Sequence, residues 1–176
     1  MTVPDKITPD TLRFERQLDA PVEKVWQYLV DPDLRACWFM GGPTDLRVGG
    51  SFGLTMNHDR LSDDHAPTPE RYRQYLGHSW NERVTRVEPP YLLAFTWENG
   101  EAGEVTFELT DEAGRTRLVL THTGLRGRPD ALDFGAGWHA HLAALERRVR
   151  GDSVKDFWAL HANAEAAVEE ALGPAT

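Results

Sequence analysis

The sequence predicts an α+β fold in which one curved antiparallel sheet wraps around a long helix near the C-terminus. Three observations indicate this: an alternating strand pattern followed by two helical segments, then short alternating segments separated by turns, and finally apolar residues spaced three and four apart. Strands and helices that are grouped along the chain are typical of α+β proteins. We therefore expect about six or seven strands in one sheet, with two short helices after the first strand.

The composition fits a single domain. A chain of 176 residues can bury a sizeable core without disulfides or metal. Cys37 is the single cysteine, which excludes an intramolecular disulfide and favours a reducing, cytoplasmic location. The net charge of −9 disfavours nucleic acid as a partner. No run approaches the roughly 20 apolar residues that a membrane span requires, so no membrane partner is expected.

The N-terminal elements follow from proline placement and side-chain spacing. Residues 1–11 carry two prolines and no periodicity, which predicts a flexible arm. Residues 12–18 alternate, with one interruption at Arg16, and predict a half-buried strand. Pro21 suits a helix start, and Asp31 followed by Pro32 suits a second, short helix through about Phe39. The apolar face of the first helix is Val22, Val25, Trp26 and Leu29.

The middle of the chain predicts the rest of the sheet. Phe52, Leu54, Met56 and His58 share one face of an alternating segment that begins at Ser51. The acidic segment 59–70 contains prolines and predicts a hairpin loop. Further strands are expected over residues 44–48, 72–87, 92–98, 104–110 and 116–123.

The last third of the chain is helical in pattern. From Gly137 the apolar period becomes 3.6, and the helix is expected to end at Gly151. Ser153 and Asp156 have the spacing of a capping box for one more helix through about Leu172. We expect residues 12–151 to form the main domain. Residues 152–176 would add a helix packed on the same domain, either on the exposed face of the sheet or at a dimer contact.

Several motifs resemble one known superfamily. In order along residues 12–150 they are similar to the START-like (SRPBCC, helix-grip) superfamily, and specifically to its branch of activator of heat-shock protein 90 ATPase homologues. This resemblance implies the helix-grip fold, with an apolar cavity between the sheet and the long helix. The motifs are FER at 14–16, APVEKVW at 20–26, DPDL at 31–34 with WF at 38–39, VGGSF at 48–52, EPP at 88–90, FTW at 95–97, THTGL at 121–125, and GW at 137–138 with His141, Leu142 and Leu145.

Two histidines lie on faces that the periodicity assigns to the interior. His122 follows Leu118 and Leu120 on a strand, and His141 shares the helical stripe of Trp138. In a cavity they would orient a ligand carbonyl or hydroxyl, or act as general acid and base near neutral pH. The alternative, which the pattern favours, is a structural histidine whose ring nitrogens are hydrogen-bonded in the core. The same alternative applies more strongly to His58.

Aromatic residues are the other cavity candidates. Trp38 and Phe39 precede two glycines and suit a movable cavity mouth. Trp26 is expected in the core, whereas the pattern assigns no face to Trp80. His65, His139 and His161 are expected at the surface. The predicted cavity residues are Trp38, Phe39, Phe52, Met56, Trp97, His122, Trp138 and His141.

Catalytic and metal signatures do not occur in the sequence. There is no serine elbow, zinc-protease, phosphate-loop or dinucleotide motif. His139 and His141 lie about 200° apart around a helix, and one cysteine cannot build a zinc cluster. No cofactor and no metal are therefore expected.

Three functions are consistent with these features. The first is a domain that binds a small hydrophobic or aromatic molecule in an internal cavity, with no assigned catalysis. The second is a cyclase- or hydrolase-type enzyme that uses His122 or His141 as general acid and base. The third, which rests on the family resemblance, is a co-chaperone-like module that binds a heat-shock protein 90 homologue. A homodimer stays open as a further partner.

Overall fold

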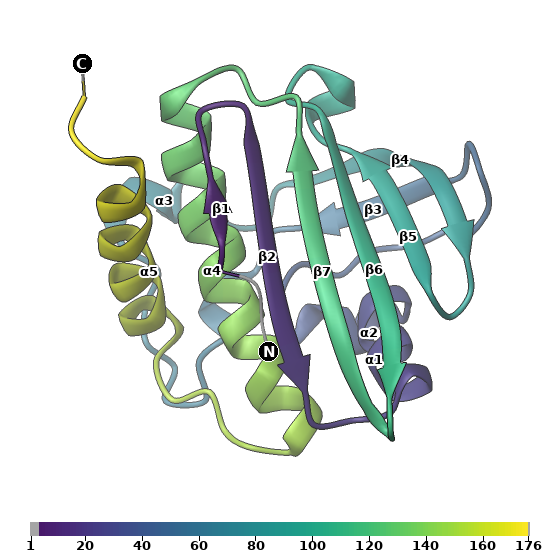
Figure 1. Cartoon of the computed structure of the whole chain (residues 1–176). Coiled ribbons are helices and arrows are strands. Elements are labelled where there is room, and N and C mark those ends of the chain that lie inside the picture. The colour runs from purple at the N-terminus through teal and green to yellow at the C-terminus, as the bar shows by residue number, and fades with distance from the viewer. Residues whose placement is uncertain (1–3, 176) are drawn as a thin grey trace.

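One seven-stranded antiparallel sheet organises the molecule (Figure 1). The computed structural model describes residues 4–175. The strand order is β1-β2-β7-β6-β5-β4-β3, and the α+β prediction is confirmed. The strands are β1 (Lys6–Ile7), β2 (Thr11–Leu18), β3 (Ser51–Thr55), β4 (Ser79–Glu88), β5 (Leu92–Thr96), β6 (Glu104–Glu112) and β7 (Arg115–Thr123).

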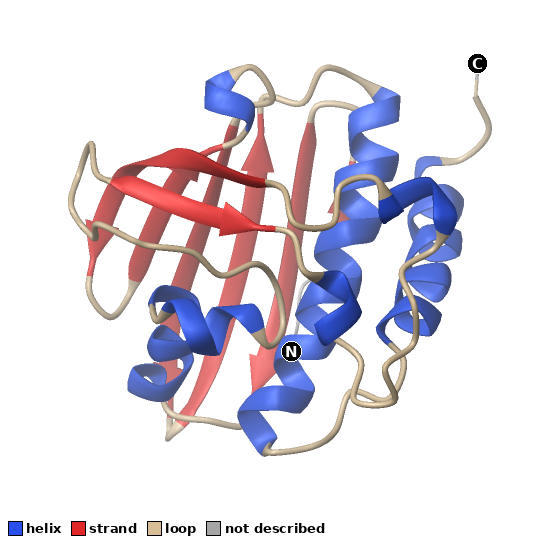
Figure 2. Cartoon of the chain, turned by 180° about the vertical axis from the view of Figure 1, so that it is seen from behind, coloured by secondary structure: helices blue, strands red, loops and turns tan. Residues whose placement is uncertain are grey.

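Helices cover one face of this sheet, and the β3–β4 hairpin bends over the same side (Figure 2). The long helix α4 packs against β2, and the α1–α2 pair lies beside it. The helices are α1 (Val22–Val30), α2 (Pro32–Ala36), α3 (Glu70–Arg73), α4 (Arg128–Arg150) and α5 (Phe157–Leu172), with 3-10 turns η1 (His58–Arg60) and η2 (Glu98–Gly100). In the described part of the chain, no helix is both long and apolar enough to cross a membrane.

Three boundaries differ from the sequence prediction. Residues 44–48 form no strand, because tight turns leave only one isolated bridge, between Thr44 and Phe52. The strand predicted over 72–87 begins only at Ser79, since the preceding residues form α3 and turns. Helix α4 begins at Arg128, nine residues before the predicted Gly137. Its first turns bury small residues, which carry little apolar periodicity.

The ends of the domain are also more ordered than expected. Within the segment predicted to be a flexible arm, Lys6 and Ile7 pair with β2. Residues 1–3 lie outside the described residues. Helix α5 is capped by Asp156, whose carboxylate accepts from two backbone N–H groups of the first turn. Ser153 therefore does not serve as the cap.

Helix α5 packs along α4 and not on the open face of the sheet (Figure 1). Gly135 of α4 makes this close approach possible. A Cβ built there would lie 3.1 Å from a methyl group of Val168 and 3.4 Å from a methyl of Leu12. Gly135 thus sits where α4, α5 and the sheet meet, so α5 is part of the same packed unit.

A buried arginine organises the segment that follows α2. Arg35 is only 1% exposed and lies over the ring of Phe52, 4.1 Å from its centroid. Its guanidinium donates to the backbone carbonyls of Leu29, Met40 and Gly53 at 2.8 to 3.0 Å. Because all these carbonyls are held by one planar group, residues 39–42 have a defined position beside α4.

Candidate functional site

Aromatic rings fill most of the space between α4 and the sheet. Phe39 lies 4.9 Å from Trp138, and Trp97 lies 5.5 Å from the same ring. Trp38 stacks on Phe39 and meets Phe107 edge-on. These separations are typical of favourable aromatic pairs. The volume between sheet and helix is therefore mainly core.

Two small cavities open on either side of one stretch of α4. The first, which we call the aromatic cleft, has a volume of about 80 Å³. The second, which we call the histidine cavity, has a volume of about 120 Å³. Both are bounded by Asp133, Gly137 and His141. The aromatic cleft is further lined by Phe39, Met40, Trp97, Phe134 and Trp138, and the histidine cavity by Met56, His58, Tyr72, Phe157, Trp158 and His161.

A pair of buried histidines separates the two cavities. The Nε2 atoms of His58 and His141 lie 3.2 Å apart, and Nδ1 of His141 lies 2.8 Å from the carbonyl oxygen of Trp38. A carbonyl only accepts, so neutral His141 carries its proton on Nδ1 and presents a lone pair at Nε2. His58 must then donate from Nε2. Its Nδ1 is left as an unprotonated acceptor, and this buried atom has no hydrogen-bond partner.

Both rings are neutral at pH 7. Burial, with a smaller contribution from nearby His161, lowers the pKa of His58 to about 4, and Asp59 opposes this shift. Burial also lowers the pKa of His141 well below its usual value, and the neighbouring His58 acts in the same direction. A histidine pair of this kind donates and accepts hydrogen bonds but carries no charge.

Asp133 lies at the rim shared by both cavities. The residue as a whole is exposed to solvent. Its carboxyl group is nevertheless partly surrounded by protein, and this desolvation raises its pKa. It is the one acidic side chain that lines the two openings. An entering anion would therefore meet a like charge.

His122 makes a closed set of hydrogen bonds in the core. Trp138 donates from Nε1 to its Nδ1 at 3.0 Å, and its own Nε2 donates to the carbonyl of Ala102 at 2.8 Å. The side chain is fully buried, and burial lowers its pKa to about 4. Neither ring nitrogen is free, and His122 lines neither cavity. This geometry supports the structural interpretation of His122.

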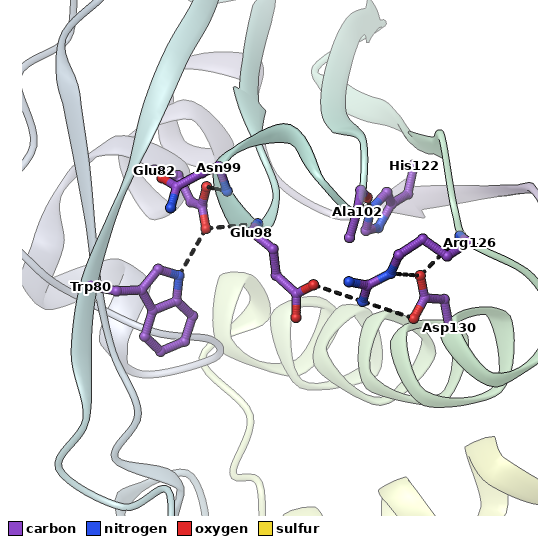
Figure 3. A network of polar contacts seen from close by, with 8 residues as sticks. All are labelled: Trp80, Glu82, Glu98, Asn99, Ala102, His122, Arg126 and Asp130. Atoms are coloured by element: carbon purple, nitrogen blue, oxygen red, sulfur yellow. Dashed lines mark hydrogen bonds and ion pairs between the residues drawn. The ribbon is translucent and has the colours of Figure 1, made fainter.

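The loop between β5 and β6 holds Trp97 in the cleft, and Glu82 anchors one side of it (Figure 3). One carboxylate oxygen accepts from the backbone N–H of Glu98 at 3.0 Å, and the other accepts from Asn99 at 2.9 Å. Trp80, whose face the sequence does not assign, donates from its indole to the same carboxylate at 2.9 Å. Glu82 is a buried carboxylate that sequence reasoning missed.

The other side of this loop is tied to the start of α4 (Figure 3). The guanidinium of Arg126 forms two ion pairs. Its Nη2 lies 2.6 Å from Oε2 of Glu98, and its Nε lies 2.8 Å from Oδ2 of Asp130. These contacts are partly exposed, so each contributes little stability by itself. Together they join the loop that carries Trp97 to the helix that carries Trp138.

The match to a family model covers most of the domain. Residues 19–150 match the model described as activator of Hsp90 ATPase homolog 1-like protein. The chain belongs to this family. The predicted resemblance is therefore confirmed. No curated protein matches the chain significantly.

Solved structures share the fold of this chain. A Bordetella parapertussis protein with a solution NMR structure is 40% identical, with 99% of this chain and 97% of that chain covered and a TM-score of 0.79. CalU16 from Micromonospora echinospora is 24% identical, with 93% and 94% covered and a TM-score of 0.67. DynU16, a protein in the dynemicin biosynthetic locus, is 24% identical, with 84% and 50% covered and a TM-score of 0.64. The last two likenesses show the fold.

Some predicted site residues meet at the two cavities, and others do not. Phe39, Trp97, Trp138 and His141 line the aromatic cleft, and His141 lines the histidine cavity together with Met56. The remaining predicted residues, Trp38, Phe52 and His122, lie in the core and line neither. Trp38 donates from Nε1 to the carbonyl of Tyr28 at 2.7 Å, so it is anchored and does not form a movable mouth.

The histidine cavity depends on a helix beyond the family match. Phe157, Trp158 and His161 come from α5, whereas the match to the activator of Hsp90 ATPase homolog 1-like family ends at residue 150. The prediction that His161 lies at the surface is wrong, because it is only 6% exposed. His161 lies four residues after Phe157 and three after Trp158, and this helical spacing could have indicated that it faces the same side as both.

No metal centre is formed within residues 4–175. No group of three or more His, Cys, Asp or Glu side chains there could hold a metal ion. The side chains that line the two cavities offer aromatic stacking together with hydrogen bonds from and to neutral imidazoles.

Proposed function

We propose that this protein binds a small, apolar aromatic molecule in the aromatic cleft. The observation that carries this proposal is the convergence of four aromatic side chains, from three parts of the chain, on one opening beside a neutral histidine. Pockets for small molecules commonly combine apolar walls with a few polar groups. The convergent side chains are Phe39, Trp97, Phe134 and Trp138, with His141 beside them.

Binding requires a lining side chain to move. The cleft holds about 80 Å³, which is less than the roughly 150 Å³ that accommodates benzene. Phe134 is half-buried at the opening, where its ring stacks on His122 at 5.5 Å and meets Trp97 edge-on at 5.9 Å. We expect it to swing outward. Phe39, by contrast, is packed between Trp38 and Trp138.

The likeness to DynU16 is consistent with the proposal that this protein binds a small organic ligand. DynU16 shares the fold and is a protein in the dynemicin biosynthetic locus. A catalytic role has less support, because His122 has no free ring nitrogen and Nε2 of His141 is engaged by His58. An interaction with a heat-shock protein 90 homologue rests on the family description alone. A pull-down at micromolar concentration tests that alternative.

The test of the proposal is an NMR titration with naphthalene. The indole N–H signals of Trp97 and Trp138 should shift, whereas that of Trp26 in α1 should not. Binding should also raise the melting temperature, since a ligand that binds only the folded state stabilises it. Absence of shifts up to the solubility limit, or shifts confined to other residues, would overturn the proposal.

Matched variants locate the ligand. Phe134→Leu removes the ring that must swing outward and should therefore strengthen binding, while Tyr91→Leu changes an exposed ring that does not line the cleft. Equal affinities for the two variants would contradict the assignment to the cleft. Thermal unfolding of both variants controls for changes in stability.

A further inference from the structure

The histidine cavity contains a hydrogen-bond acceptor that has no protein partner. His58 is only 6% exposed, and its Nδ1 atom is unpartnered. The proton order along the chain from Trp38 through His141 requires this atom to be an unprotonated acceptor. A buried polar group without a partner costs about 1 to 3 kcal/mol. Such an atom on a side chain that lines a cavity therefore indicates a missing hydrogen-bond donor.

The same cavity also contains an unsatisfied donor. The indole Nε1 of Trp158 is buried without a hydrogen-bond partner, and Trp158 lines the cavity together with His58. The two rings lie 5.8 Å apart between centroids. One acceptor and one donor are the complement of a hydroxyl group, which donates one hydrogen bond and accepts others.

The walls of the cavity suit a flat ring. Tyr72 stacks on Trp158 with 5.4 Å between ring centroids, and Phe157 meets Trp158 edge-on at 5.2 Å. The volume of about 120 Å³ is slightly below the roughly 150 Å³ that holds benzene. A single ring that projects partly from the opening therefore matches the size, whereas a fused polycycle does not.

Electrostatics favour a neutral occupant. No arginine or lysine lines the cavity, and Asp133 lies at its rim. The guanidinium of Arg71 lies over the ring of Tyr72, but it forms an ion pair with Glu165. A carboxylate or phosphate would meet the charge of Asp133 without a free cation to bind it.

We propose that the histidine cavity is a binding site for a small neutral hydroxyaromatic molecule of the phenol class, whose hydroxyl donates to Nδ1 of His58. The ring of the ligand packs among the aromatic side chains of α3 and α5, and its oxygen accepts from the indole of Trp158. This site is separate from the aromatic cleft. Three of its lining residues, Phe157, Trp158 and His161, lie on α5 outside the family match, and the others lie within it.

The experiment compares phenol with toluene, which has the same shape but lacks the hydroxyl. In the wild-type protein, phenol should shift the Nδ1 signal of His58 and the indole N–H signal of Trp158, and toluene should not shift the His58 signal. The ratio of the toluene to the phenol dissociation constant should fall on the order of tenfold in His58→Phe. Using this ratio cancels general effects of the variant on stability.

Two further variants keep the test decisive. Trp158→Phe retains the stacking ring and removes the donor, so it should lower the same ratio even where His58→Phe fails to fold. Phe134→Leu alters only the aromatic cleft and should leave phenol binding at His58 unchanged.

Three results would overturn the proposal. They are equal responses of His58 to both probes, phenol shifts confined to Trp97 and Trp138, or a structure with phenol in which only an ordered water meets Nδ1 of His58. The second result would support the aromatic cleft and reject this site, so the two proposals fail independently.

Discussion

Acidification should destabilise this protein through His122, which is buried as a neutral imidazole. Burial lowers its pKa to about 4, from 6.5 for an exposed histidine. Between pH 6.5 and about 4 the unfolded chain therefore binds a proton at this position and the folded chain does not. The stabilising contribution is fully present above pH 6.5 and is lost progressively as the pH falls to about 4.

The magnitude follows from the size of the pKa shift. A shift of about 2.5 pKa units at about 1.4 kcal/mol per unit corresponds to about 3 kcal/mol. That is a large part of the 5 to 15 kcal/mol by which a typical domain is stable. Asp130 attracts the protonated ring and opposes the shift. Its own pKa is lowered by its hydrogen bonds with Arg126.

The assay is urea unfolding of the wild type and His122→Gln between pH 7 and pH 4. The glutamine amide can still donate to the carbonyl of Ala102, but it does not titrate. At pH 7 the variant should be less stable, because Trp138 loses an ideal acceptor. The difference in the free energy of unfolding between wild type and variant should then shrink by about 3 kcal/mol on going to pH 4.

A difference in the free energy of unfolding between wild type and variant that does not change with pH would refute the reasoning. His58 and His141 also have lowered pKa values, and Asp133 and Glu146 have raised ones. These groups are present in both proteins, so their contributions cancel in the difference. His65→Gln replaces an exposed side chain and serves as the control, which should follow the wild type.

Three further substitutions test the supports of the site. Arg35→Lys should lower the free energy of unfolding by about 3 kcal/mol or more, because one ammonium cannot satisfy the buried carbonyls; a loss below about 1 kcal/mol in urea unfolding would contradict this. Glu82→Gln should cost about 2 kcal/mol and speed amide exchange in the β5–β6 loop, because an amide nitrogen would face N–H donors; unchanged exchange would oppose this. Gly103→Ala should be more destabilising in thermal unfolding than Gly114→Ala, since both have positive φ but only the first would place a Cβ against the carbonyl oxygen of Thr123; equal losses would show that φ alone decides.

Elements with strong alternation or helical periodicity were predictable from the sequence. The strands β2, β6 and β7 and the helix α1 fall where the spacing of apolar residues places them. The start of α4 was not predictable, because its buried residues there are small. The segment before Ser79 was also misassigned, since it forms α3 and turns, and Tyr72 of α3 packs against Trp158 of α5.

For the candidate site, the sequence indicated side chains but not their partners. Phe39, Trp97, Trp138 and His141 were identified as inward-facing, and they meet at one cleft. The alternation that placed His122 inside does not distinguish a cavity residue from a core residue. That distinction depends on Trp138 and Ala102, which are 16 and 20 residues away along the chain.

The sequence by itself determined the α+β class, the order of most elements, the family and the inward faces of the main strands and of α4. Each of these depends on local spacing or on motifs within a short stretch of chain. Only the tertiary structure decided that His58 faces His141 across 83 residues, and that α5 closes the cavity around them. The physical reason is that hydrogen bonds form between atoms brought together by the fold. The protonation state of His58, and with it the chemistry of the cavity, therefore depends on residues distant in sequence.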